Sequence, residues 1–221
     1  AGHGAADVST RERRIVPREA SAGMIGRTPR GGNNVAETAQ TITPESVLAF
    51  WFSEPHRNLW FRSTDAFDAE IRERFEETVQ RALDGRLDQW SASARGALAL
   101  VILLDQFPLN MYRNRPESFS GEAAARAIAD HALSRGLDAQ MNDQERTFLL
   151  LPFMHSEDLR DQERSVTLFE AAGLQNNLRW ARHHHDIVRR FGRFPHRNAV
   201  LGRDSTEEEI AWLASPDAFH G

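Results

Sequence analysis

The apolar run from Ala97 to Leu104 constrains the fold more than any other stretch of this sequence. Its eight consecutive apolar residues lead directly into Asp105 and Gln106. A helix that is apolar on all sides belongs in a core. An aspartate and a glutamine at the end of such a helix must be solvated, hydrogen-bonded or used in function. Because Pro108 follows, we expect the helix to stop there and residues 108–120 to form a loop.

The bulk composition indicates a globular protein with one ordinary core. The chain has 221 residues, of which 40% are hydrophobic and 27% charged, and a net charge of -5. That charge argues against a general nucleic-acid binder. No apolar run reaches the roughly 20 residues of a membrane span, and no apolar core of a signal peptide is found near the start. We therefore expect a cytoplasmic protein with neither nucleic acid nor membrane as a partner.

Two residue types are missing, and their absence excludes several chemistries. The chain has no cysteine, which rules out disulfides, thiolate nucleophiles and cysteine-ligated metals. All 27 basic residues are arginine, so Schiff-base catalysis and a Walker-type phosphate loop are excluded as well.

The composition changes near residue 40. Residues 1–40 are rich in Gly, Ala, Arg and Thr and show no helical period. Such a segment cannot bury enough apolar surface to order itself. We expect a weakly ordered N-terminal tail over residues 1–40 and a single all-helical domain over residues 41–221.

Apolar residues at helical spacing, with start and stop signals, fill the rest of the chain. Four residues have the type and position of helix N-caps: Thr43, Ser93, Asn142 and Thr206. The pattern predicts about seven or eight helices and no convincing strand, joined by short connections. The expected fold class is all-α, an array of antiparallel helices.

Three apolar segments of the chain end in polar clusters. They read LDQFP at 104–108, LPFMHSEDL at 151–159 and FGRFPHRN at 191–198, with LGR following at 201–203. These motifs resemble the bacterial family of unknown function DUF924, and the resemblance covers roughly residues 43–214. It implies a tetratricopeptide-like fold, an α-α superhelix, and it brings no established activity. It also places His184 where the family pattern has a histidine.

The residues of these clusters are the candidates for function. Histidines that are oriented by carboxylates are suited to acid–base catalysis near neutral pH. The hypothetical catalytic set is His155, Asp158, His184 and Asp105. Arginines, histidines and amides can hold a carboxylate or phosphate. The hypothetical ligand-binding set is Gln106, Arg193, His196, Arg197, Asn198 and Arg203.

Two functional hypotheses and one structural interpretation remain open. The first is a pocket for a small anionic ligand, in a protein that could be a hydrolase. The second is a non-catalytic tetratricopeptide-like scaffold that binds a peptide or protein partner. In the structural interpretation, the same side chains fix helix ends by hydrogen bonding. We predict no cofactor. His155 and Asp158 stand three residues apart and His184 could join them at a metal, but no HExxH motif is present, so we predict no metal either. The sequence decides neither whether the protein is an enzyme nor its oligomeric state.

In the helix expected around residue 184, Trp180 and Ile187 stand four before and three after His184. Residues at these spacings share a helix face. We therefore expect all three side chains to point to the same side.

Overall fold

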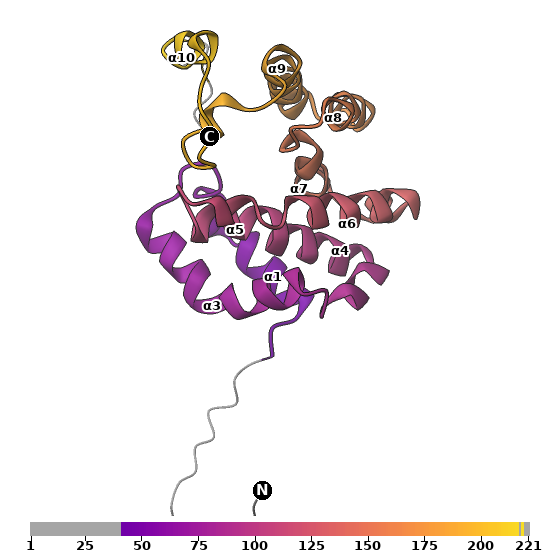
Figure 1. Cartoon of the computed structure of the whole chain (residues 1–221). Helices are drawn as coiled ribbons and strands as arrows, with labels where there is room; N and C mark the ends of the chain where they lie inside the picture. Colours follow the sequence, from indigo (N-terminus) through magenta and orange to yellow (C-terminus); the bar gives the residue numbers. More distant parts are fainter. Residues whose placement is uncertain (1–40, 217, 219–221) are drawn as a thin grey trace, which may run out of the picture. The chain divides into compact units, whose positions relative to one another are not determined.

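The computed structural model describes residues 41–216 and residue 218, and the regular secondary structure in this part of the chain is helical (Figure 1). The predicted tail of residues 1–40 lies outside the described residues. No strand occurs within them, so the all-α prediction is confirmed. The helices are α1 (Pro44–Trp51), α2 (Glu54–Arg57), α3 (Asp65–Leu83), η1 (Asp88–Ala92), α4 (Ala94–Val101), η2 (Ile102–Gln106), α5 (Phe107–Met111), η3 (Pro116–Phe119), α6 (Glu122–Ser134), η4 (Leu137–Gln140), α7 (Asp143–Met154), α8 (Leu159–Ala171), α9 (Gln175–Phe191), η5 (Pro195–Arg197) and α10 (Glu207–Leu213).

The four predicted N-caps all start helices. Thr43, Asn142 and Thr206 form capping boxes with the third residue of α1, α7 and α10, and the Ser93 side chain accepts from the Gly96 amide at the start of α4. Each cap satisfies backbone amides that have no partner inside the helix. These boundaries are therefore set by local sequence.

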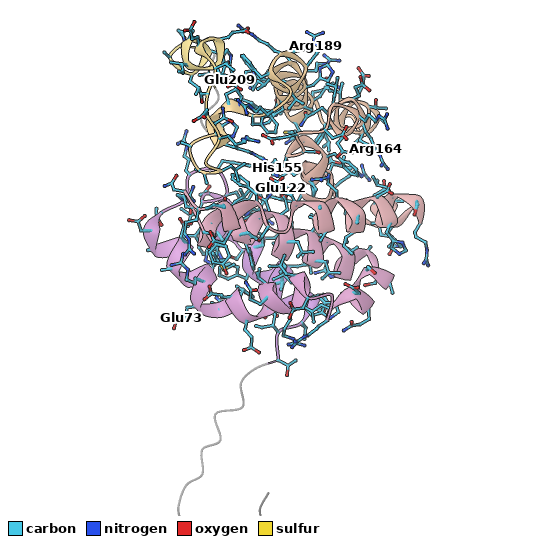
Figure 2. All side chains as sticks on the ribbon, in the orientation of Figure 1. Glu73, Glu122, His155, Arg164, Arg189 and Glu209 are labelled. Carbon is cyan, nitrogen blue, oxygen red and sulfur yellow. The ribbon has the colours of Figure 1, made fainter. Side chains whose placement is uncertain are left out.

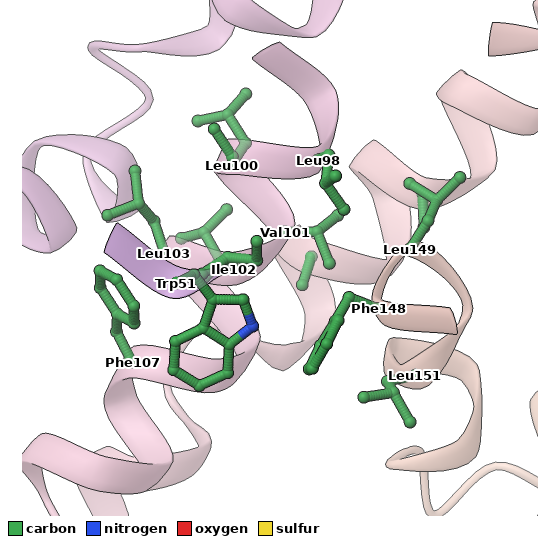
Figure 3. Packing of buried hydrophobic residues seen from close by; sticks show 14 of the residues in the cluster. Trp51, Leu98, Leu100, Val101, Ile102, Leu103, Phe107, Phe148, Leu149 and Leu151 are labelled. Atoms are coloured by element: carbon green, nitrogen blue, oxygen red, sulfur yellow. The ribbon is translucent and has the colours of Figure 1, made fainter. Parts of the chain in front are cut away.

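Helix α4 is the centre of the core. It packs against α1, α6 and α7, and every residue from Ala97 to Leu104 is buried. Figure 3 shows Leu98, Val101 and Ile102 of this stretch in one cluster with Trp51 of α1 and Phe148 of α7. The core helix predicted from the apolar run is thus observed.

The chain does not stop at Pro108, and the predicted loop at 108–120 is wrong at its start. The helix continues through the π-helical turn η2 into α5, which contains Pro108. The amide of Phe107 donates to the carbonyl of Ile102, five residues back. Because proline has no N–H, it cannot serve the carbonyl four residues before it, and a π-turn is one way to accommodate this gap. The extra residue changes the helical register just where Asp105 and Gln106 lie.

Helices α8 and α9 pack closely against each other and follow α7 (Figure 1). Pro152 lies inside α7, and the helix runs two residues beyond it before ending at Met154. After α9 the chain returns past α6, so that η5 is brought next to the end of α7 and the start of α6. This return places the third polar cluster beside the first two.

Gly121, immediately before α6, touches the backbone of η2. A Cβ atom added there would lie 2.1 Å from the carbonyl oxygen of Leu104. We expect Gly121→Ala to lower the free energy of unfolding by about 1–3 kcal/mol or more, because neither backbone can yield without moving a helix end. Urea unfolding measures this, with exposed Ser120→Ala as the control. A loss below about 0.5 kcal/mol would contradict this tight contact.

Among the described residues, no helix combines the length and apolarity that crossing a membrane requires.

Candidate functional site

A buried aspartate and a partly exposed histidine form the centre of the candidate site. Nδ1 of His155, at the C-terminal end of α7, lies 2.8 Å from Oδ1 of Asp105 in η2. The Asp105 side chain is fully buried, and that of His155 is 18% exposed. The Gln106 amide also donates to Oδ2 of Asp105. An ionised carboxylate can only accept, so Nδ1 of His155 carries the proton in this pair.

Arg197 of η5 closes one side of this centre. Its Nη2 donates to the carbonyl oxygen of His155 at 3.0 Å, and its Nη1 donates to Oε2 of Glu122 at 3.2 Å. The guanidinium carbon lies 4.4 Å and 4.8 Å from the ring centres of Phe119 and Phe194. With its side chain only 7% exposed, Arg197 joins α6, α7 and η5 at one point.

Glu122, the first residue of α6, is the member of this site that the sequence analysis missed. Figure 2 shows its label beside that of His155, and its charge acts on His155, Asp105 and Arg197. Nothing in the sequence around Glu122 indicated a functional residue, because acidic residues are common in the first turn of any helix. Its importance comes from what α6 faces.

Burial and charge move the pKa values of the two central groups. Burial raises the pKa of Glu122 above its ordinary value, despite the opposing charges of Arg197 and His155. Burial opposes the charge of His155, yet the carboxylates of Asp105 and Glu122 outweigh it and raise its pKa. His155 therefore keeps its proton to a higher pH than an ordinary histidine does.

His184 of α9 belongs to the second layer around this centre. Its Nδ1 lies 2.9 Å from the Trp180 carbonyl, and its ring stands edge-on to Phe194, with 5.5 Å between ring centres. Burial lowers the pKa of His184 to about 3, so the ring is neutral at ordinary pH. His184 and Ile187 are buried, and Trp180 is 45% exposed. All three lie in α9 at the helical spacing noted above, and the expectation that their side chains point to the same side stays a prediction.

His196 of η5 also packs near Phe194. The centres of its ring and the Phe194 ring are 5.5 Å apart. Phe194 is thus contacted by His184, His196 and Arg197, three residues that the sequence analysis had singled out.

The remaining predicted ligand groups are engaged within the chain. Arg193 donates to both carboxylate oxygens of Glu209, and Arg203 donates to both oxygens of Glu157. Asn198, which is 1% exposed, donates to Glu209 and accepts from Arg203. These contacts commit both guanidinium groups to the chain's own carboxylates and give them no shared geometry for an anion.

Asp158 is a helix cap in this structure. Its side chain is exposed and accepts from the amide of Arg160 at the start of α8. Because its carboxylate caps α8, Asp158 is not the carboxylate that orients His155. That contact is made by Asp105.

The family model described as a bacterial protein of unknown function (DUF924) matches residues 47–217. The chain belongs to the DUF924 family. A solved structure, the protein of unknown function ATU0120 from Agrobacterium tumefaciens, is 38% identical and has a TM-score of 0.74. The match covers 77% of this chain and 96% of that one. No curated protein matches the sequence.

The family match confirms the resemblance, and the helices of the described residues confirm the helical array. The tetratricopeptide-like superhelix stays a prediction. Because the family carries no described activity, the chemistry of this DUF924 member has to be argued from the centre formed by Asp105, Glu122, His155 and Arg197, which we call the His155 centre.

The DUF924 chain also has an open hollow elsewhere. It measures about 370 Å³ and lies between α8 and α9, where it is lined by Glu163, Val166, Arg182, His185 and Asp186. Its lining shares no residue with the His155 centre. Within the described residues, no group of three His, Asp or Glu side chains is arranged to hold a metal ion.

The buried neutral His184 predicts a measurable pH effect. Its folded pKa of about 3 lies below the ordinary value of 6.5. The unfolded chain therefore binds more protons between these two values, and stability falls as pH falls through this window. We expect His184→Gln to remove roughly 2 kcal/mol of the stability difference between pH 6.5 and 5.

Urea unfolding at several pH values measures this contribution. Asn176→Ala on the same helix is the control: Asn176 is exposed and has no ionisable group, so this variant should keep the wild-type slope. Because His155 has a raised pKa, its contribution runs in the opposite direction, so the comparison must be made between variant and wild type. Equal slopes in His184→Gln and wild type would contradict a buried neutral His184.

Proposed function

We propose that this DUF924 protein is a hydrolase that acts on a small anionic substrate at the His155 centre. His155 is the acid–base residue, and Asp105 fixes its orientation and proton. One observation carries the proposal. Nδ1 of His155 is bound to the fully buried Asp105, while Nε2 has no hydrogen-bond partner within residues 41–216. This division of the two ring nitrogens is what a histidine needs for proton transfer to a bound molecule.

The charges around His155 favour an anionic substrate. When His155 is protonated, Nε2–H is a charged donor, and a charge-assisted hydrogen bond to a carboxylate or phosphate oxygen is stronger than a neutral one. Arg197 adds a second cation at the same point, although its own hydrogen bonds go to Glu122 and the His155 carbonyl. The anion is therefore expected at His155 rather than at the arginines 193 and 203.

Water is the natural nucleophile for such a site. The nearest sequence neighbour with a hydroxyl, Ser156, is 2% exposed and donates to Asp161, so it is not placed for attack. A deprotonated His155 can instead remove a proton from a water molecule. Because the pKa of His155 is raised, the rate should climb with pH through a value above the ordinary pKa of histidine.

Hydrolysis of p-nitrophenyl phosphate and of carboxylate-bearing p-nitrophenyl esters tests the proposal. We expect one substrate class to be turned over, with activity lost by at least about a hundredfold in His155→Gln and Asp105→Asn. His185→Gln, in the hollow between α8 and α9, is the matched control and should stay active. Equal rates in His155→Gln and wild type, or turnover of neither substrate class, would refute the proposal.

The alternative, a scaffold for a peptide or protein partner, is supported by the hollow between α8 and α9. That hollow has a size suited to a ligand, but only Val166 in its lining is apolar. Partner binding that is lost in Arg182→Glu and unaffected in His155→Gln would favour this second function.

A further inference from the structure

Charge balance in the His155 centre limits how an anion can bind there. When both carboxyl groups are ionised and His155 is protonated, the four side chains of the centre carry two negative charges, on Asp105 and Glu122, and two positive charges, on His155 and Arg197. None of the four side chains is more than 18% exposed. An added anion would bring an uncompensated negative charge into a poorly solvated place, which is strongly unfavourable.

We propose that the His155 centre binds a monoanionic carboxylate together with one proton, and that Glu122 is the residue that takes up this proton. The inference rests on the proposed function, because it concerns the same site and the same class of substrate. No bond is made or broken in this step. A carboxylate and a proton enter, and the Glu122 carboxylate becomes a carboxylic acid.

The contacts of the four residues single out Glu122 as the proton acceptor. Both oxygens of Asp105 already accept a hydrogen bond, from His155 and from Gln106, so a proton on either oxygen would compete with a hydrogen bond in a fully buried place. Arginine stays charged at every accessible pH, and below its pKa His155 already holds a proton on both ring nitrogens. Glu122 accepts a single hydrogen bond among the described residues, from Nη1 of Arg197 to Oε2.

The second oxygen of Glu122 is the atom that can carry the proton. Oε1 is buried and lies 3.0 Å from Nη2 of Arg197, but it receives no hydrogen bond from that group. Nη2 donates to the His155 carbonyl instead. A proton on Oε1 would therefore cost the ion pair some attraction but no hydrogen bond. Burial, which raises the pKa of Glu122, acts in the same direction.

The charged groups that face Glu122 come from three other elements. Asp105 lies in η2, His155 at the end of α7 and Arg197 in η5. On α6 itself, Arg126 lies one turn further and is paired with Asp161 of α8 at 3.1 Å. Because Arg126 is already paired, the charges of Asp105, His155 and Arg197 decide whether Glu122 is protonated.

Acetate is the probe for the test, because it is the smallest planar carboxylate. The dissociation constant is followed from pH 5 to 8 in the full chain through the side-chain NMR signals of His155. Below the pKa of His155, we expect the acetate Kd of the wild type to rise up to tenfold per pH unit, as one proton is taken up per acetate. Glu122→Gln keeps an acceptor for Arg197 but cannot titrate, so its Kd should be level over that range.

A second readout uses the wild type alone, in case Glu122→Gln does not fold. In protein carrying ¹³C-labelled glutamate, the Glu122 carboxyl carbon should move to the shift of the acid form when acetate saturates the site. Glu157→Gln is the matched control: Glu157 is half-buried and paired with Arg203, and its removal should leave the proton linkage intact.

The outcomes separate this inference from the proposed function. Acetate that perturbs His155 while the Glu122 carbon keeps its ionised shift, or a wild-type Kd that stays level with pH, overturns proton uptake by Glu122 and leaves the anion site standing. Acetate that does not perturb His155 at any pH overturns both. Proton-linked acetate binding in the wild type, together with hydrolysis rates that are equal in His155→Gln and wild type, would support the inference about Glu122 and overturn the catalytic role of His155.

Discussion

Arg197→Ala is expected to lower the free energy of unfolding by about 3–5 kcal/mol, the typical result of removing one partner of a buried ion pair. Arg197 is 7% exposed on its side chain and bonded to Glu122 and to the His155 carbonyl. Its removal leaves the Glu122 charge buried without compensation and opens a gap between the rings of Phe119 and Phe194. Urea unfolding at pH 7 measures the loss.

Arg190→Ala is the matched control for Arg197. Arg190 is paired with Glu208, but both side chains are more than half exposed, so the change should cost less than about 1 kcal/mol. Arg197→Ala combined with Glu122→Gln should recover part of the stability, because the buried charge is then removed as well. If Arg197→Ala melts like the wild type, Arg197 is not the tie between α6, α7 and η5 that its contacts indicate.

Leu103→Ala should cost about 2–5 kcal/mol, through lost burial and the cavity that remains. Leu103 is 0% exposed and lies in η2, next to Phe107 in the core (Figure 3). Because η2 also holds Asp105, part of the damage should reach the His155 centre, which the NMR signals of His155 would report.

Leu159→Ala provides the comparison for Leu103, since Leu159 is a leucine at a helix start that is 38% exposed. Its loss should stay below about 1 kcal/mol. A Leu103→Ala loss in that same small range would contradict the close packing of η2 against its neighbours.

Local sequence predicted the helices well where their signals act over a few residues. The capping residues Thr43, Asn142 and Thr206 satisfy backbone amides three residues away, so their effect can be read from the chain itself. The burial of Ala97–Leu104 followed from the same kind of evidence, because a helix apolar on every side has no face to offer to water.

At Pro108, local sequence signals did not predict the course of the helix correctly. Proline removes one hydrogen bond, and sequence alone does not say whether the helix ends or widens into a π-turn. Here the helix continues, because the segment from Ile102 to Met111 is held on both sides by packing, including the close approach of Gly121 to the Leu104 carbonyl. Contacts with residues distant in sequence therefore decided between a helix end and a π-turn.

The sequence by itself determined the helical class, the buried helix through Ala97–Leu104 and the three polar clusters that mark a DUF924 member. Only the tertiary structure decided which polar groups meet: His155 with Asp105, Arg197 with Glu122, and the arginines 193 and 203 with Glu209 and Glu157. The physical reason is range. Caps and periodicity act within one or two helical turns, whereas the partner of a buried charge is whichever group the packing of distant helices brings within hydrogen-bonding distance.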